Sequence, residues 1–267
     1  MNEQFREVKA LGGAVPYLGG KRLLAKAIIS KIEAVPHVCY AEPFVGAGGV
    51  FFRRKLAPKA EVINDLNRDI ATFFRVLQRH YQAFLDMMKW QITTRVEFQR
   101  LVKTDPDTLT DLERAARFYY LQRICFGGKV RTRTFGVTPQ ERARFDITKL
   151  GPELEALHCR LSGVVIECLG FETMIEKYDR PGTLFYLDPP YFGCEKDYGI
   201  GLFSRSDFEA LAKRLFRIHG KFILSLNDRP EVREIFQAFR IDAVKTVYTV
   251  GGGKQARPAS EVIISMV

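Results

Sequence analysis

The amino-acid sequence predicts an α/β fold in which helices cover a mixed sheet of seven strands. Short apolar runs alternate with amphipathic stretches of helical length along most of the 267 residues. The last two strand-like runs are joined by a segment without a helical pattern, so they are expected to pair antiparallel, whereas the other strands need helical crossovers. The stretch between about residues 90 and 150 breaks the alternation. We therefore expect a Rossmann-like sheet with an antiparallel C-terminal hairpin and an inserted, mainly helical subdomain.

Each expected strand is a short run rich in β-branched, aromatic and other apolar side chains. The strands are expected at Val38–Ala41, Glu61–Asn64, Val164–Cys168, Leu184–Leu187, Lys221–Leu226, Ile241–Tyr248 and Val262–Met266. The helices between them follow the spacing of an amphipathic helix. They are expected at Lys21–Ile32, Arg68–Lys89, Pro152–Leu161, Phe171–Tyr178, Asp207–Ile218 and Pro230–Ala238.

The interrupting stretch divides the chain into a catalytic domain, residues 1–90 and 151–267, and an insert, residues 91–150. Within the insert, Arg95–Val102 and Leu112–Ile124 have a helical pattern, and Gly127–Ile147 is rich in Gly and Arg. Between Arg123 and Lys149 there are seven basic residues and two acidic ones. The local net charge is therefore +5, half of the net charge of +10 of the whole chain. A basic segment of this kind is typical of a surface that contacts a polyanion. The candidate contact residues are Arg123, Lys129, Arg131, Arg133, Arg142 and Arg144.

Composition and residue usage exclude several classes of protein. With 46% hydrophobic and 27% charged residues the chain is typical of globular proteins. It contains no apolar run long enough to span a membrane, and its first ten residues lack the apolar segment of a signal peptide, so a cytoplasmic location is expected. The five cysteines form no CxxC pair and the four histidines have no zinc spacing, so neither a disulfide framework nor a metal site is expected.

The most specific motif is Asp188-Pro189-Pro190-Tyr191, which directly follows an apolar strand. Ligands bind at the carboxyl ends of strands in open α/β sheets, and prolines stiffen the turn while leaving carbonyl oxygens free to accept hydrogen bonds. A carboxylate, a rigid carbonyl and an aromatic ring suit the exocyclic amine of a flat nucleobase. The carboxylate of Asp188 and the carbonyl of Pro189 accept its two N–H bonds, and Tyr191 stacks on the ring. The alternative is a turn that is capped by Asp188 beside a core tyrosine.

Three weaker motifs indicate a second ligand that carries a nucleoside. Glu42 to Gly49 (EPFVGAGG) forms a glycine-rich turn after a strand, although the glycine spacing differs from the dinucleotide motif GxGxxG. Asp65 follows Gly46 at close to the spacing at which an acidic residue meets ribose hydroxyls in nucleoside-binding folds. Pro16 to Lys21 (PYLGGK) opens a helix and is suited to an anion. Each motif also has an ordinary explanation: a glycine turn, an Asx turn and a helix start with a solvated lysine.

The order of these motifs resembles the Dam-like class of DNA adenine-N6 methyltransferases. In that class a PYLGGK-like element comes first, followed by an EPFVGAGG-like element and an NDLN-like element, here Asn64 to Asn67. An inserted target-recognition region and then DPPY come next, and the resemblance covers about residues 15–264. It implies an enzyme that transfers the methyl group of S-adenosylmethionine to N6 of an adenine flipped out of double-stranded DNA, without a metal. The implied partner is DNA, with no membrane and no obligate protein partner.

The resemblance also implies roles for individual residues. Asp188, Pro189, Pro190 and Tyr191 would form the catalytic corner that grips the target adenine. The cofactor would be bound by Tyr17, Gly20, Lys21, Glu42, Pro43, Phe44, Gly46, Asp65 and Asp188, with Lys21 at its carboxylate and Asp65 at its ribose.

One position departs from the family pattern. Relatives commonly carry an Asp that contacts the cofactor's adenine at the position held here by Gly170. This departure leaves an inactive DNA-binding relative open as an alternative. Methylation of cytosine N4 also stays open because it uses similar geometry, and methylation of adenine in RNA because it would keep the cofactor motifs. The missing GxGxxG argues against a nicotinamide dehydrogenase.

Overall fold

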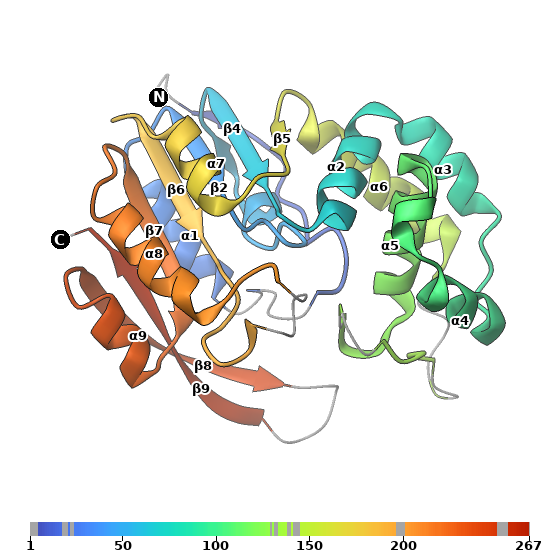
Figure 1. Cartoon of the computed structure of the whole chain (residues 1–267). Helices are drawn as coiled ribbons and strands as arrows, with labels where there is room; N and C mark the ends of the chain where they lie inside the picture. Colours follow the sequence, from blue (N-terminus) through green and yellow to red (C-terminus); the bar gives the residue numbers. More distant parts are fainter. Residues whose placement is uncertain are drawn as a thin grey trace.

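The computed structural model describes residues 5–17, 21, 24–128, 130, 133–137, 140, 145–195, 201–249 and 256–266. In this part of the chain, a seven-stranded sheet has the order β5-β4-β2-β6-β7-β9-β8 (Figure 1). The strands are β2 (Cys39–Glu42), β4 (Ala60–Asn64), β5 (Val165–Glu167), β6 (Thr183–Leu187), β7 (Lys221–Asn227), β8 (Arg240–Thr249) and β9 (Ala256–Ser265). A separate two-stranded sheet, which the sequence analysis did not predict, pairs β1 (Arg6–Glu7) with β3 (Leu56–Ala57).

The pairing directions follow from the connections. The first five strands in the sheet order are mutually parallel, whereas β9 is antiparallel to both β7 and β8. The expected fold class, a mixed sheet with an antiparallel C-terminal hairpin, is therefore confirmed. Because β9 lies between β7 and β8, the hairpin is an integral part of the sheet.

Alternate residues of the buried strands face opposite layers of helices. On β6, Leu184 and Tyr186 pack in one core with α1 (Ala25–Glu33) and α2 (Arg68–Arg79). Phe185 and Leu187 pack in a second core. That core includes α7 (Phe171–Tyr178), α8 (Arg205–Leu215) and α9 (Pro230–Ile235). Burial on both faces explains why these strands read as continuous apolar runs.

The helical part contains α3 (Tyr81–Lys89), α4 (Arg95–Lys103), α5 (Asp111–Ile124) and α6 (Ile147–Leu161), beside the edge of the sheet at β5 (Figure 1). The helix expected over residues 68–89 is two helices, because the backbone of His80 leaves the helical region. The helix expected from Pro152 begins at Ile147 instead. Asp146 caps the N-terminus of this helix by accepting from the backbone N–H of Thr148 at 3.1 Å. The helix then continues past Pro152, which lies inside it.

The inserted helices share their core with the neighbouring helices of the catalytic region. The ring of Phe73 on α2 stacks on that of Tyr119 on α5, with centroids 5.6 Å apart and an angle of 18° between the planes. Phe84 on α3 meets the edge of the same tyrosine. The division at residues 91 and 150 stays a prediction.

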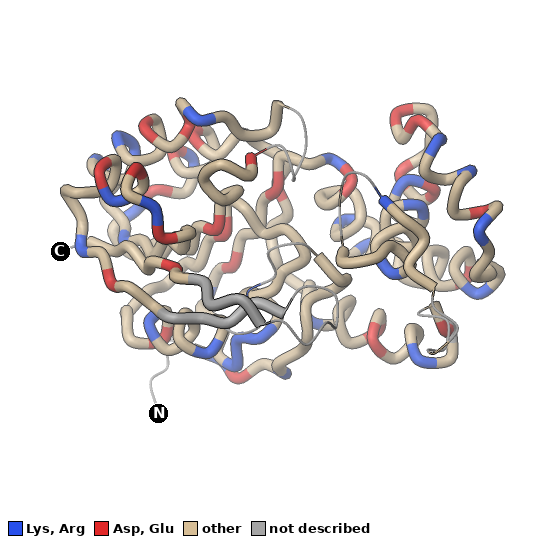
Figure 2. The backbone as a smooth tube through the Cα atoms, turned by 90° about the horizontal axis from the view of Figure 1, so that it is seen from below, with Lys and Arg blue, Asp and Glu red and all other residues tan. Residues whose placement is uncertain are grey.

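Charged residues of both signs are spread over both parts of the molecule (Figure 2). In the described part of the chain, no helix is long and apolar enough to cross a membrane.

Candidate active site

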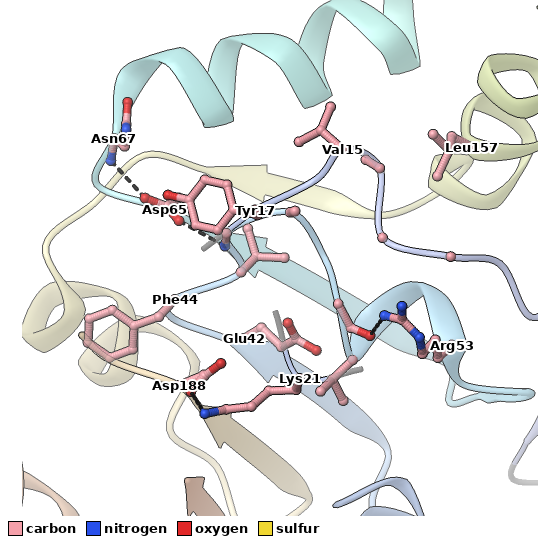
Figure 3. Close-up of a pocket in the computed structure, with 18 of the residues that line it drawn as sticks. Val15, Tyr17, Lys21, Glu42, Phe44, Arg53, Asp65, Asn67, Leu157 and Asp188 are labelled. Carbon is pink, nitrogen blue, oxygen red and sulfur yellow. Dashed lines mark hydrogen bonds and ion pairs between the residues drawn. The ribbon is translucent and has the colours of Figure 1, made fainter. Parts of the chain in front are cut away.

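Three neighbouring parallel strands end at the same edge of the sheet and place the predicted motifs together. β2 ends at Glu42, β4 at Asn64 and β6 at Leu187, so the residues that follow each strand gather around one cleft. This cleft is a cavity of about 770 Å³ (Figure 3). From the predicted set, its walls include Tyr17, Lys21, Glu42, Pro43, Phe44, Gly46, Asp65, Asp188 and Pro190.

The carboxylate of Asp188 is fixed through one of its two oxygens. Oδ1 accepts from the ammonium of Lys21 at 3.0 Å and from the hydroxyl of Ser225 at 3.1 Å. Since the single hydroxyl hydrogen of Ser225 is used in this way, Ser225 accepts from the hydroxyl of Tyr186, 2.9 Å away. Oδ2 has no hydrogen bond to a described residue, and the side chain lies in the cavity wall (Figure 3). The arrangement leaves one acceptor oxygen for a ligand.

Burial raises the pKa of Asp188 to about 6, and the charge of Lys21 opposes that rise. The charge of Glu261 adds to it. The carboxyl group is therefore mainly ionised at neutral pH, which suits an acceptor of N–H bonds.

Lys21 is buried, and its ammonium has three acceptors. Besides Asp188 these are Oε2 of Glu261 at 3.0 Å and the hydroxyl of Tyr191 at 2.6 Å. The ammonium has three hydrogens, so binding the cofactor's carboxylate, as the resemblance implies, requires one of these contacts to be given up. In this structure Lys21 contacts Asp188 and Tyr191 of the DPPY motif and thus extends the corner predicted at residues 188–191.

The remaining residues of the DPPY motif form the rest of that corner. Pro189 and Pro190 are buried, and Pro190 lines the cavity. The Tyr191 hydroxyl donates to Oε1 of Glu261 at 2.6 Å, and the ammonium of Lys21 lies 4.2 Å from the centre of its ring. The hydroxyl is thus tied inward, which holds the ring in place.

Asp65 and Asn64 hold the turns at the ends of the strands. Asp65 accepts from the backbone N–H of Gly46 at 2.9 Å and of Asn67 at 2.9 Å. Its carboxyl is buried, which raises its pKa to about 6 against the effect of these bonds. The amide of Asn64 donates to the carbonyls of Pro43 and Leu169, both at 2.9 Å. The turns after β2, β4 and β5 are therefore joined around the predicted cofactor site.

Gly46 is required where the glycine-rich turn approaches Tyr17. Its φ of 51° lies in the left-handed region, and a Cβ there would come within 3.3 Å of the Tyr17 ring.

Glu42 is a buried carboxyl group in the floor of the cleft. Its Oε1 accepts from the hydroxyl of Tyr40 at 2.5 Å. Burial raises the pKa of Glu42 to about 8, although the bond from Tyr40 opposes the shift. A cationic ligand would favour its ionised form.

Three aromatic rings cluster at one side of the cleft, next to Gly170. The ring of Phe44 lies 5.8 Å from that of Phe171 and 5.6 Å from that of Phe203. All three line the cavity. Gly170 precedes α7, and a Cβ added to it would meet nothing within 4 Å.

The candidate DNA-contact residues are only partly described. Lys129, Arg131, Arg142 and Arg144 lie outside the described residues, as does Gly20, which was predicted to bind the cofactor. The guanidinium of Arg123 pairs with Glu153 and stacks over the ring of Tyr119. Arg133 donates to the side chain of Gln122 at 3.2 Å. Its Nε is buried without a hydrogen bond to a described residue. Both described arginines are thus engaged within the protein.

Two residues of the corner, Glu261 and Ser225, were missed by the sequence analysis. Ser225 lies within the apolar strand run Phe222–Leu226, and Glu261 directly precedes the run Val262–Ile264. Both side chains are buried. A charged residue at such a position is a signal in itself, since an unpaired buried charge is costly. Among the described residues, no group of three or more His, Cys, Asp or Glu side chains is placed to hold a metal ion.

Known proteins are similar to this chain over most of its length. A type II methyltransferase, M.CviBI of Paramecium bursaria Chlorella virus NC1A, is 23% identical over 211 residues, which is 78% of this chain and 80% of the relative. The type II methyltransferase M1.LlaDCHI of Lactococcus lactis is 24% identical, covering 93% of both chains. A DNA adenine methylase of Haemophilus influenzae is 22% identical, covering 94% of this chain and 91% of the relative.

Residues 17–250 match the family described as D12 class N6 adenine-specific DNA methyltransferase. The matched range begins at Tyr17 in the wall of the cleft, includes Asp188, Tyr191 and Ser225, and ends directly after β8, so that Glu261 on β9 lies outside it. The motif order had predicted a class of the same kind, and that prediction is confirmed. The chain therefore belongs to the D12 class N6 adenine-specific DNA methyltransferase family.

Proposed function

We propose that the protein methylates N6 of an adenine that is flipped out of double-stranded DNA, with S-adenosylmethionine as the methyl donor. The observation that carries this proposal is the anchoring of Asp188 through Oδ1 alone, beside a cleft large enough for a nucleoside-bearing cofactor. Family membership supports adenine N6 over cytosine N4 and over an RNA substrate.

The cleft fits the cofactor in shape and chemistry. Its volume of about 770 Å³ is in the range of small-molecule sites, and it combines apolar rings with acidic groups. Phe44, Phe171 and Phe203 would hold the adenine, in place of the acidic residue that Gly170 lacks. Asp65 would meet the ribose, and Glu42 would face the cationic part. When bound, S-adenosylmethionine supplies an electrophilic methyl group on a positively charged sulfur.

The corner would grip the target base by its amine. Oδ2 of Asp188 and the carbonyl of Pro189 accept the two N–H bonds, and the ring of Tyr191 supports the base. Holding the hydrogens in this way directs the nitrogen lone pair at the methyl group. No strong general base is needed, because methylation makes the amine acidic, and its proton passes to Asp188 or to water.

The base must leave the duplex to reach Asp188, at a cost of a few kcal/mol. Stacking on Tyr191 would return about 1–3 kcal/mol by analogy with proteins that bind single strands. Phosphate contacts from the basic segment would supply further affinity.

Action on DNA implies a cytoplasmic location. Because two relatives are type II methyltransferases, we also propose a role in restriction–modification.

The proposal is tested by the modified base itself. Duplex DNA, single-stranded RNA and a duplex without adenine are incubated with methyl-labelled S-adenosylmethionine, digested to nucleosides and analysed by mass spectrometry. N6-methyladenine from duplex DNA alone is expected. N4-methylcytosine, methylated RNA or cofactor binding without product would each replace the proposal by the corresponding alternative.

The rate of methyl transfer is expected to fall below pH 6. A protonated Asp188 cannot accept from the amine through Oδ2, and its pKa of about 6 predicts a roughly tenfold loss for each pH unit below that value. Single-turnover rates measured between pH 5 and 9 check this. Two other carboxyls of the cleft also have a raised pKa, Glu42 at about 8 and Asp65 at about 6. Asp65→Asn distinguishes Asp65, which should affect cofactor binding, and Glu42→Gln removes Glu42. The acid limb should remain in both variants. Its disappearance from either one would assign the limb to the carboxyl removed there.

Neutralising the basic segment is expected to reduce the salt dependence of DNA binding. For each phosphate contact removed by changing Lys129, Arg131, Arg142 or Arg144 to Gln, the slope of log affinity against log salt should fall by about 0.9. Arg133→Gln is the matched control, because its guanidinium contacts Gln122, and its slope should stay unchanged. Unchanged slopes in all four variants would remove the segment from the DNA interface, and a slope reduced only in Arg133→Gln would make Arg133 the phosphate contact instead.

A further inference from the structure

Glu261 is a buried carboxylate that stands behind the catalytic corner. It lies on β9 opposite Asn227 of β7, with 1% of its surface exposed, and it is not part of the cavity wall. Its two oxygens have different partners: Oε2 accepts from Lys21 at 3.0 Å and Oε1 from Tyr191 at 2.6 Å. Glu261 therefore reaches both residues that surround Asp188 without reaching a ligand.

The three side chains form a closed set of hydrogen bonds. Lys21 donates to the hydroxyl of Tyr191, and that hydroxyl donates to Glu261, which in turn accepts from Lys21. Each contact fixes the direction of the next, so neither the ammonium nor the tyrosine ring can turn without breaking a buried bond. Charge-assisted bonds of this kind are short and directional.

The charges are unequal. One ammonium, that of Lys21, serves two carboxylates, those of Asp188 and Glu261. If these two are ionised, the corner carries a net negative charge next to the cleft in which we place a cationic cofactor. Burying an acidic residue without full compensation is costly, so a purely structural purpose would be served better by an uncharged residue.

We propose that Glu261 is a positioning residue for methyl transfer: through Lys21 it keeps the ammonium on Oδ1 of Asp188, and through Tyr191 it sets the plane on which the target base stacks. This inference rests on the proposed function.

Glu261→Gln separates this role from simple core packing. With its oxygen on Tyr191, an amide of the same size turns its NH2 group to the ammonium of Lys21, and a donor meets a donor. With its oxygen on Lys21, its NH2 group can donate only if the hydroxyl of Tyr191 turns its own hydrogen away, so the closed set is broken or reversed, and the negative charge is lost in either orientation. We expect single-turnover methyl transfer to fall by about 100-fold, the cost of a misplacement near 1 Å, while the Kd of S-adenosylmethionine changes little.

The pH profile gives the second readout. The groups that face Asp188 are Lys21, Tyr186, Tyr191, Ser225, Glu42 and Glu261. Burial raises the pKa of Asp188 most, Lys21 lowers it, and the charge of Glu261 raises it. Removing that charge should move the acid limb of the rate profile to lower pH even as the rate falls. A loss of rate that comes only from altered core packing would leave the acid limb of the rate profile at its wild-type pH.

Two further variants complete the test. Glu261→Asp keeps the charge but shortens the side chain, so the rate should fall while the acid limb stays at its wild-type pH. Tyr191→Phe removes the hydroxyl from the set, and its loss should not add to that of Glu261→Gln in the double variant, since both break the same contacts. Circular dichroism and thermal melting confirm that each variant is folded.

Several outcomes would overturn the inference. They are a wild-type rate in Glu261→Gln, an acid limb that does not move, and losses in the double variant that add fully. If Glu261→Gln does not fold, Glu261→Asp and Tyr191→Phe decide: wild-type rates in both would reject the role. A wild-type protein that transfers no methyl group to DNA would instead reject the proposed function.

Discussion

Replacing Asp188 by Asn is expected to reduce methyl transfer by about 1,000-fold, the cost of losing one preorganised polar contact to a reacting group. The structure makes this nearly isosteric change severe. Lys21 and Ser225 both donate to Oδ1, so the amide oxygen of the variant must stay on their side. The amide NH2 then faces the incoming amine, and a donor meets a donor. Single-turnover assays on duplex DNA measure the loss.

Cofactor binding should survive this change. Lys21 keeps Glu261 as a charged partner, so Asp188→Ala and Asp188→Asn should both bind S-adenosylmethionine with nearly the wild-type Kd in calorimetry. Asp179→Asn is the matched control. Asp179 lies before the opposite end of β6 and bonds the backbone of His219 and Gly220. The Asp179→Asn variant should retain methyl-transfer activity. Loss of cofactor binding together with activity would contradict the assignment of Asp188 to the target base.

Replacing Glu61 by Ala is expected to lower the free energy of unfolding by about 3–5 kcal/mol, because it leaves two buried guanidinium groups without their counter-charge. Glu61 on β4 accepts from Arg160 through both oxygens, at 2.7 Å each, and lies 3.1 Å from Arg54. All three side chains are almost fully buried. The two cations also lie over aromatic rings, Arg54 on Tyr40 at 3.6 Å and Arg160 on Phe51 at 4.1 Å.

Thermal unfolding checks this prediction. At about 2–4 °C for each kcal/mol, Tm should fall by roughly 6–20 °C. Asp86→Asn removes an exposed ion pair with Lys89 and should leave Tm nearly unchanged, because exposed ion pairs are screened by solvent. A similar small effect for Glu61→Ala would mean that water or another group compensates the two arginines.

The positions of the predicted motifs could be derived from the sequence because they depend on local patterns. Asp188, Asp65 and Glu42 each end an apolar run, and the ends of neighbouring parallel strands meet at one edge. This was sufficient to predict where the cleft lies.

The partners inside the corner could not be derived in the same way. The contacts of Lys21 and Tyr191 with Glu261 depend on which strand β9 joins, a long-range choice that local propensity does not determine. The break at His80 depends on how α3 packs in the helical core, and the inward turn of Arg133 depends on Gln122. Charge along the chain predicts a basic surface, but it does not tell which arginines are used within the fold.

The ion pair between Lys21 and Glu261 joins positions 240 residues apart. Glu261 lies on β9, which follows β8 in the chain but is placed between β7 and β8 in the sheet. The pair therefore cannot form until β9 has been synthesised and has entered the sheet. Up to that moment the ribosome-bound polypeptide already has the strands that shape the cleft, but it lacks the last tether of the catalytic corner. Methylating capacity should consequently arise late in biogenesis, in a single step, when the final strand docks.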